Sequence, residues 1–142
     1  MKLSIVIPML NEAARIARAL ESLAPLRARG HEVIVVDGGS EDGSRELALP
    51  LADRVLDAPR GRARQMNAGA AAASGDALLF LHADTRLPAN ADHFIFHSLK
   101  KNSWGRFDVA IEGRSALLPV IAFLMNTRSR LTGIATGDQA IF

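Results

Sequence analysis

Apolar runs and amphipathic segments alternate along the first 87 residues of the chain. Residues 3–7, 32–36, 54–56 and 77–81 are short apolar runs, most of them rich in β-branched side chains, which favours strands. Residues 12–23 have the apolar spacing of a helix and Asn11 as its predicted N-cap, a short helix follows residue 43, and the alanine-rich residues 61–73 favour a third helix. This alternation predicts a parallel sheet flanked by helices, an α/β fold.

The pattern beyond Pro88 predicts a helix over residues 91–100 and strands over 107–111 and 139–142. Another apolar run, residues 116–125, contains Pro119 and is about half as long as the roughly 20 residues that span a bilayer. We predict a core helix for this run. The alternatives are a lid, a contact in a homodimer, or a surface that touches a membrane peripherally.

Composition narrows the classes of protein. A chain of 142 residues that is 49% hydrophobic and 23% charged is typical of one globular domain, here residues 1–142. The net charge is +2, and no basic stripe with interleaved aromatic residues indicates a nucleic acid partner. The chain has no cysteine, which excludes disulfides and thiolate metal sites and fits a cytoplasmic location.

The residues after the fourth predicted strand form a candidate cation site. His82 and Asp84 are two residues apart, so on an extended chain their side chains point the same way. A carboxylate at the carboxyl end of a strand can hold a hard divalent cation against a phosphate. The alternative is that Asp84 starts a turn toward Pro88 while His82 packs in the core.

Three polar segments should converge, because ligands bind at the carboxyl ends of parallel strands: residues 8–12, 37–43 and 82–86. The Asp37 carboxylate could accept hydrogen bonds from a ribose hydroxyl or a base, and Gly38 and Gly39 allow a close approach of ligand and backbone. The alternative is a plain polar turn. Neither GxGxxG after the first strand nor GxxxxGK[ST] occurs, which weighs against dehydrogenases and P-loop nucleotidases.

Several motifs in this order resemble family 2 glycosyltransferases of the GT-A, or nucleotide-diphospho-sugar transferase, fold. They are SIVIPMLNE at 4–12, VVDGGSEDG at 35–43, NAG at 67–69 and HAD at 82–84. WGRFD at 104–108 and GDQAIF at 137–142 are similar to a bacterial subgroup of unassigned substrate. The resemblance implies a nucleotide-sugar-binding half over residues 1–87 and a partial acceptor-side half over 88–142.

The resemblance also implies a reaction and roles for residues. The expected donor is a UDP- or GDP-linked sugar, transferred to an unknown acceptor with inversion and with Mg²⁺ or Mn²⁺. Asp84 would bind the metal that bridges the diphosphate; His82 replaces the usual aspartate and could ligate the metal, bind phosphate or ribose, or be structural. The substrate-binding residues expected by position are Pro8, Asn11, Glu12, Asp37, Gly39, Arg64, Asn67, His82 and Ala83.

Other candidates rest on weaker patterns. Arg60, Arg62 and Arg64 enter the alanine-rich helix, where guanidinium groups and helix N–H donors could meet a phosphate, or form a solvated face. Arg128 and Arg130 could serve the acceptor or the diphosphate. Trp104 could stack on a sugar or pack in the core. Surface or helix-face positions are expected for the remaining histidines, His31, His93 and His97.

The general base is the part of the reaction that the sequence leaves open. Inverting transfer needs such a base near the acceptor hydroxyl, and relatives usually take it from a Glu-Asp pair after the GDQ-like segment. The chain stops at Phe142 before any such pair, so we expect a truncated chain in which donor binding survives better than transfer. Asp138 could contact the acceptor or act as a substitute base. The alternatives are a non-catalytic nucleotide-binding or interaction module, and a sugar nucleotidyltransferase, although residues 9–14 lack the glycine-rich basic loop that the latter requires.

Overall fold

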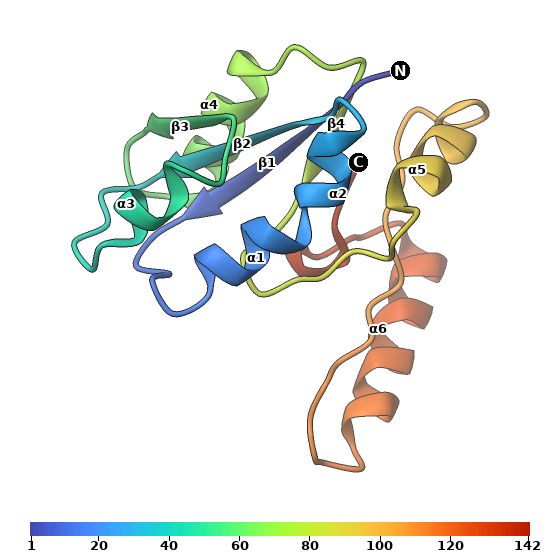
Figure 1. Ribbon diagram of the computed structural model, residues 1–142. Helices are drawn as coiled ribbons and strands as arrows, with labels where there is room; N and C mark the ends of the chain where they lie inside the picture. The colour runs from blue at the N-terminus through green and yellow to red at the C-terminus, as the bar shows by residue number, and fades with distance from the viewer.

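The fold is built on a four-stranded parallel sheet with the strand order β3-β2-β1-β4 (Figure 1). The computed structural model describes residues 1–142 apart from the side chain of residue 138. The strands are β1 (Leu3–Met9), β2 (Glu32–Asp37), β3 (Arg54–Asp57) and β4 (Ala77–Phe80). The predicted α/β fold with a parallel sheet is confirmed, with strand bounds within two residues of the predicted ones.

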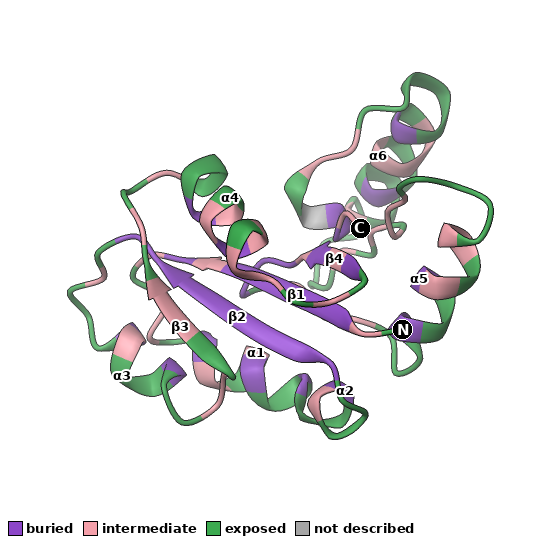
Figure 2. Cartoon of the chain, turned by 90° about the horizontal axis from the view of Figure 1, so that it is seen from above, coloured by how far each residue is buried: buried purple, intermediate pink, exposed green. Residues whose placement is uncertain are grey.

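Helices cover both faces of this sheet. Figure 2 shows α4 on one side and α1, α2 and α3 on the other. The helices are α1 (Ile16–Ser22), α2 (Ala24–Ala28), α3 (Ser44–Ala48), α4 (Arg62–Ala72), α5 (Ala91–Leu99) and α6 (Leu118–Thr132), followed by the 3₁₀ helix η1 (Gly137–Gln139).

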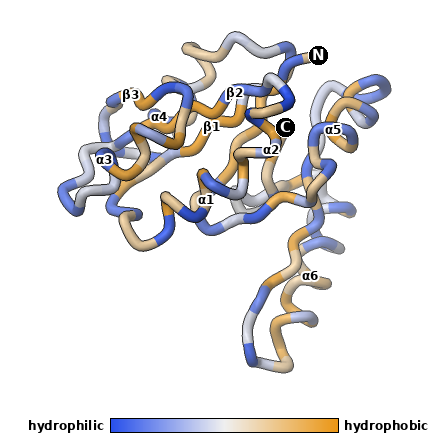
Figure 3. The backbone as a smooth tube through the Cα atoms, in the orientation of Figure 1, coloured by the Kyte–Doolittle hydropathy of each residue, from blue (hydrophilic) through white to orange (hydrophobic). Residues whose placement is uncertain are grey.

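The two sides of the sheet have separate apolar cores because alternate residues of a strand point to opposite faces. Ile5 and Ile7 of β1 belong to the larger cluster, which includes Ile16 and Leu20 of α1. Val6 belongs to the smaller cluster on the face that α4 covers. Hydrophobic stretches lie along β1 and β2, at the centre of the sheet (Figure 3).

The predicted start of the first helix is wrong. Asn11 has a φ of 53°, and α1 begins at Ile16 with Arg15 in the N-cap position. The Asn11 side chain accepts a hydrogen bond from the Glu41 N–H at 2.9 Å instead of capping a helix. A long-range contact therefore takes the polar group that the local pattern assigned to a cap.

The two strands predicted for the C-terminal part are also wrong as regular elements. Isolated antiparallel bridges join Ile141 to Phe80 and to Arg106. Gly105 and Phe142 exchange backbone hydrogen bonds of 2.8 and 2.9 Å, and the Phe142 ring occupies the space that a Cβ on Gly105 would need. The segments around 106 and 141 thus lie side by side next to β4, but pair too briefly to form strands.

The apolar run at 116–125 does not form the predicted core helix. It lies in and just before α6, where Leu117, Phe123 and Leu124 are 66%, 67% and 59% exposed. Figure 1 shows α6 extending away from the sheet. In the part of the chain that the structure describes, no helix is long and apolar enough to cross a bilayer.

Candidate functional site

The loops after β1 and β2 are held together at the carboxyl edge of the sheet. The Asn11 N–H donates to Ser40 Oγ at 2.9 Å, and the Glu12 N–H donates to Ser44 Oγ at 2.7 Å. The Ala13 N–H donates to Asp42 Oδ2 at 3.0 Å, and the hydrogen bond from Ser44 lowers the Asp42 pKa. These bonds fix two of the three predicted ligand-binding segments against each other, so residues 37–43 are more than a solvated turn.

Asp37 lies at the end of β2 but is buried. Its carboxylate accepts hydrogen bonds from the Ser40 N–H at 3.1 and 3.2 Å and from Ser40 Oγ at 2.5 Å. The chain between them turns through Gly39, which is exposed and has a φ of 91°. Asp37 therefore shapes the turn that presents the Gly39 backbone, and its contact with a base or ribose stays a prediction.

Gln65 is a site-building residue that sequence reasoning missed. Its buried Nε2 donates to the carbonyl oxygens of Met9 and Val36, at 2.7 and 2.8 Å, and so ties α4 to the ends of β1 and β2. A Cβ on Gly38 would lie 3.0 Å from this side chain, so Gly38 permits the close approach. Because arginines surround Gln65 in the sequence, this part of the helix was expected to face solvent, and the sequence did not indicate the contact.

The first turn of α4 brings basic side chains to the same edge. Arg60, Arg62 and Arg64 are exposed, and Gly61 precedes the helix with a φ of 136°. Asn67 is exposed one turn further along α4. The free N–H groups of a helix start and nearby guanidinium groups form a favourable environment for an anion.

A turn after β4 separates His82 from Asp84, the two residues of the candidate cation site. The strand stops at Phe80, and the Thr85 N–H donates to the His82 carbonyl at 3.0 Å, which closes a turn. The expectation that His82 and Asp84 point the same way on an extended chain is therefore wrong, because the chain turns between them. His82 and Ala83 are buried, whereas the Asp84 carboxylate is exposed and contacts Thr85 Oγ1 at 3.3 Å.

The His82 ring packs against the start of η1. A Cβ on Gly137 would lie 2.5 Å from His82 Cε1, so this glycine lets the backbone approach the imidazole. This contact brings the GDQ segment close to the end of β4. Asp138, the predicted substitute base, has a side chain outside the described residues.

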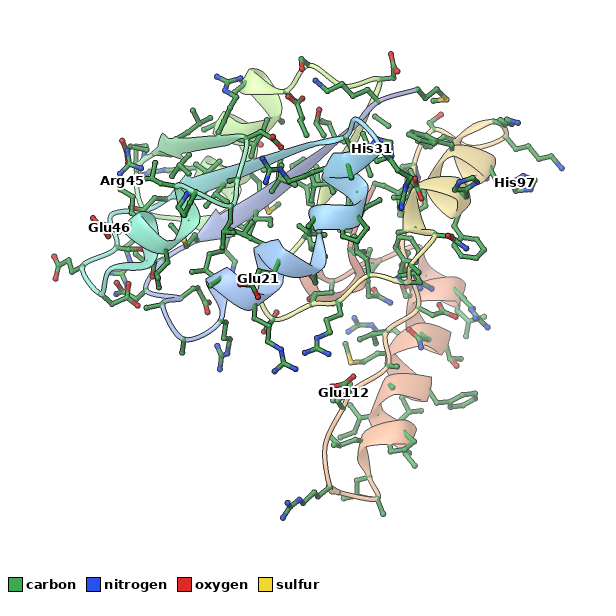
Figure 4. All side chains as sticks on the ribbon, viewed as in Figure 1. Glu21, His31, Arg45, Glu46, His97 and Glu112 are labelled. Carbon is green, nitrogen blue, oxygen red and sulfur yellow. The ribbon has the colours of Figure 1, made fainter. Side chains whose placement is uncertain are left out.

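Asp84 opens onto a cavity of about 750 Å³ between the β4 end and α6. Asp84, Arg86, Asp108 and Glu112 supply its charged groups, and most of the remaining lining is apolar. Apolar lining residues include Leu87, Pro88, Phe107, Val109, Ile111, Met125 and Ala140. Figure 4 shows Glu112 on the segment that runs beside α6.

A polar cluster joins α6 to this cavity. Asn126 accepts a hydrogen bond from the Val109 N–H at 2.8 Å and donates to the Val109 carbonyl at 2.9 Å. Arg130 contacts Asp108, and Arg106 donates to the same carboxylate at 2.7 Å. The hydrogen bond from Arg106, supported by Arg130, lowers the Asp108 pKa. Both late arginines are exposed, and Arg130 is engaged with Asp108 in holding α6.

The described residues that could ligate a metal are not clustered. Within residues 1–137 and 139–142, no three His, Cys, Asp or Glu side chains are grouped as a metal site. Mg²⁺ and Mn²⁺ are often held by one or two carboxylates, with phosphates and waters completing the shell. The exposed Asp84 carboxylate beside a cavity fits that kind of site, in which the ligand brings much of the coordination.

The remaining candidates lie away from this edge. Trp104 is 52% exposed, so the core-packing alternative for it is wrong. His31 is buried, contrary to its expected surface position: the Leu3 N–H donates to Nδ1 at 3.2 Å, and Nε2 donates to Asp92 Oδ2 at 3.1 Å. His93 and His97 are exposed on α5, as expected, and Figure 4 shows His97 pointing outward.

The sequence matches the profile described as Glycosyl transferase family 2 over residues 4–111. This chain belongs to that family. The family 2 chain is 40% identical over 91 residues to a PGL/p-HBAD biosynthesis glycosyltransferase of Mycobacterium bovis BCG. It is 35% identical over 91 residues to an uncharacterized glycosyltransferase of Nostoc sp. PCC 7120.

The matched segments cover 59% of this chain but 36% and 28% of these two relatives, so the family 2 chain spans about a third of their length. Among solved structures it resembles glucosyl-3-phosphoglycerate synthase from Mycobacterium tuberculosis in complex with Mn²⁺, UDP and glucosyl-3-phosphoglycerate. That likeness has a TM-score of 0.61 and 28% identity, and covers 71% of this chain and 40% of the synthase.

A second solved structure supports the fold. Staphylococcus aureus TarS 1–349 in complex with UDP-GlcNAc has a TM-score of 0.64 and 21% identity, over 82% of this chain and 37% of TarS. The glycosyltransferase class predicted from the motifs is confirmed by the family match, and the predicted GT-A fold is confirmed by these structures.

Proposed function

We propose that the chain binds a UDP- or GDP-linked sugar together with Mg²⁺ or Mn²⁺ and forms the donor side of a glycosyltransferase that inverts the anomeric carbon. The observation that carries this proposal is the exposed Asp84 carboxylate, which follows β4 and lines a cavity; exposed arginines at the start of α4 support it. Family membership and a structural relative that binds Mn²⁺ and UDP support it. The absence of cysteine supports a cytoplasmic location.

The nucleoside part of the donor would lie on the joined loops after β1 and β2. Pro8 and Glu12 are half-buried there, Asn11 is exposed, and the Gly39 backbone is open to a ligand. Asp37 supports the turn from below through Ser40. Since the loops are already held by hydrogen bonds, little ordering entropy remains to oppose binding.

The diphosphate would lie between Asp84 and the start of α4. A divalent cation bound by Asp84 would offset the negative charge that develops on the leaving diphosphate. Arg60, Arg62 and Arg64 are exposed where their guanidinium groups can reach phosphate oxygens, with Asn67 behind them on α4. His82 would position η1 through its contact with Gly137, and ligation of the metal by its imidazole is a second proposed role.

The acceptor would enter the cavity beside Asp84. Of its carboxylates, Asp108 is a poor general base, because Arg106 and Arg130 hold its pKa below the ordinary value. Asp138 stays the proposed substitute base on motif grounds alone. The matched segment covers only about a third of the curated relatives. The acceptor and the transfer step therefore depend on parts of the relatives that this chain does not match.

Isothermal titration calorimetry of the chain with UDP and with GDP, with and without Mn²⁺, tests the donor site. We expect one nucleotide to bind in a Mn²⁺-dependent way, and Asp84→Asn to weaken that binding by roughly tenfold or more. Glu21→Gln, which removes an exposed charge on α1, is the matched control and should bind like the parent. Mn²⁺-independent binding, or equal affinities of the Asp84→Asn variant and the parent, would refute the proposal.

A further inference from the structure

The outer face of α6 is a row of exposed apolar side chains. The first four follow the i, i+3, i+4, i+7 spacing of one helix face, and all five are between 44% and 82% exposed. On the opposite face, Ala122 and Ser129 are buried. The outer face consists of Leu117, Val120, Ile121, Leu124 and Leu131. A helix usually turns such a row toward a core, so this row is suited to contact something beyond the folded chain.

The charged side chains of α6 itself are all basic. Residues 113–137 contain no Asp or Glu, although the chain carries 15 in 142 residues. The same segment has three arginines: Arg130 contacts Asp108, while Arg114 and Arg128 are exposed. Apolar side chains with cations on the same helix complement a surface that is apolar inside and anionic at its rim.

The fold presents the outer face instead of burying it. Asn126 and Ser129 fix the inner side of α6, the former to Val109 and the latter to Gln139 at 3.2 Å. The apolar N-terminal half extends past these contacts, away from the sheet (Figure 1). Figure 3 shows hydropathic positions along this projecting helix. The helix is therefore anchored by polar contacts at one end and offers apolar side chains at the other.

We propose that α6 binds the surface of a bilayer that contains anionic phospholipids. The 15-residue helix would lie in the headgroup layer with its outer face toward the acyl chains. Arg128 lies on the same face, at i+11 from Leu117. In a pair of α6 helices this guanidinium would be buried against apolar side chains, whereas at a bilayer it reaches phosphate while its stem stays apolar. A bilayer therefore suits the outer face better than a second copy.

Co-sedimentation with phosphatidylcholine vesicles, with and without about 30% phosphatidylglycerol, tests this proposal. We expect binding to the anionic vesicles that weakens with salt. The double variant Ile121→Gln/Leu124→Gln should lose roughly tenfold in affinity, and Arg128→Gln roughly fivefold. Phe94→Gln on α5, where Phe94 is 60% exposed, and Arg18→Gln on α1 are the matched controls and should bind like the parent. All of these positions are exposed, and circular dichroism checks that each variant folds.

An environment-sensitive fluorophore gives a second measurement. The chain has no cysteine, so Leu124→Cys can be labelled alone; we expect a blue shift on anionic vesicles, and none for a label at Phe94→Cys. Absence of vesicle binding, or equal binding by the outer-face variants and the controls, would overturn the proposal. So would a dimer in sedimentation equilibrium that the outer-face variants abolish while vesicle binding is unchanged.

Discussion

The absent Cβ of Gly69 sets how closely α4 packs on the sheet. A Cβ there would lie 2.3 Å from Val6 Cγ1 and 3.0 Å from Val36 Cγ2. The close contact allows Gln65, one turn earlier, to reach the carbonyl oxygens at the ends of β1 and β2. A single small residue thus contributes both to packing and to the geometry of the donor edge.

Gly69→Ala should therefore destabilise the chain by about 1–3 kcal/mol, because the added methyl overpacks the interface. In an open helix position the same change would stabilise by up to about 1 kcal/mol, so the sign of the effect is diagnostic. The free energy of unfolding from urea titrations measures it. Ala71→Leu, on an exposed position of α4, is the control and should change stability by less than about 0.5 kcal/mol. A stabilised Gly69→Ala variant would contradict the packing argument.

At the residue scale, the sequence predicted where a residue lies in the fold better than which groups its side chain bonds to. Asp84 was expected at a ligand-accessible strand end, and its carboxylate is exposed there. Asn11 was expected to cap a helix, and Gln65 was not singled out at all. Both side chains bond to groups about 30 or more residues away, at 2.9 Å to Glu41 N–H and at 2.7 Å to the Met9 carbonyl oxygen. Such contacts depend on tertiary placement, which spacing along the chain does not encode.

At the element scale, Glu32 joins the beginnings of β1 and β2 to the end of α4. Its carboxylate accepts hydrogen bonds from Ser4 and from the Ser74 N–H, the latter at 2.6 Å, and lies 3.3 Å from Lys2 Nζ. Burial alone would raise the Glu32 pKa, but the hydrogen bonds from Ser4, Ser74 and Lys2 lower it from 4.5 to about 2. The ionised carboxylate is thus stabilised in the folded chain.

A group whose folded pKa is lowered contributes stability above its unfolded pKa and loses that contribution as the pH falls through its folded pKa. Between about pH 5.5 and pH 2, the parent should therefore lose on the order of 3 kcal/mol more unfolding free energy than Glu32→Gln. Urea titrations across this range measure the difference. Glu46→Gln, at an exposed position of α3, is the control and should follow the parent. Parallel pH curves for Glu32→Gln and the parent would contradict the prediction.

The elements that the sequence predicted correctly are those with a local signal. The four strands of the sheet and α4 have apolar runs or alanine-rich composition, and their bounds agree with the structure within two residues. Residues 107–111 and 139–142 have a strand-like pattern, but strands also need long partners. Here the pairing is limited to isolated bridges of Ile141 with Phe80 and with Arg106. The apolar run of α6 was predicted to lie in the core, because the sequence shows that these side chains are apolar but not whether they face the core or the solvent.

At the scale of the whole molecule, the chain has a firmly packed sheet and a loosely attached late part. The larger core cluster includes β1, β2, α1 and α2, with Ile5, Val33 and Leu20 almost fully buried. In α6, by contrast, the buried residues are Ala122 and Ser129, and polar contacts through Asn126 hold the helix. Segments with few buried apolar contacts open at lower free energy than the core.

Amide hydrogen exchange should therefore show α6 and residues 106–113 opening before β1 and β2, by a difference of at least about 2 kcal/mol in opening free energy. Asn126→Ala should widen this difference, because it removes both hydrogen bonds to Val109 while leaving the sheet unchanged. Asn102→Ala is a matched control, since the side chain that it removes bonds within its own segment, to the Ser98 carbonyl at 3.1 Å. If α6 exchanged only together with β1 and β2, the chain would be one cooperative unit. In that case anionic vesicles should not protect α6 amides separately from those of the sheet. If α6 opens by itself, the vesicles should slow exchange in α6 and leave exchange in β1 and β2 unchanged.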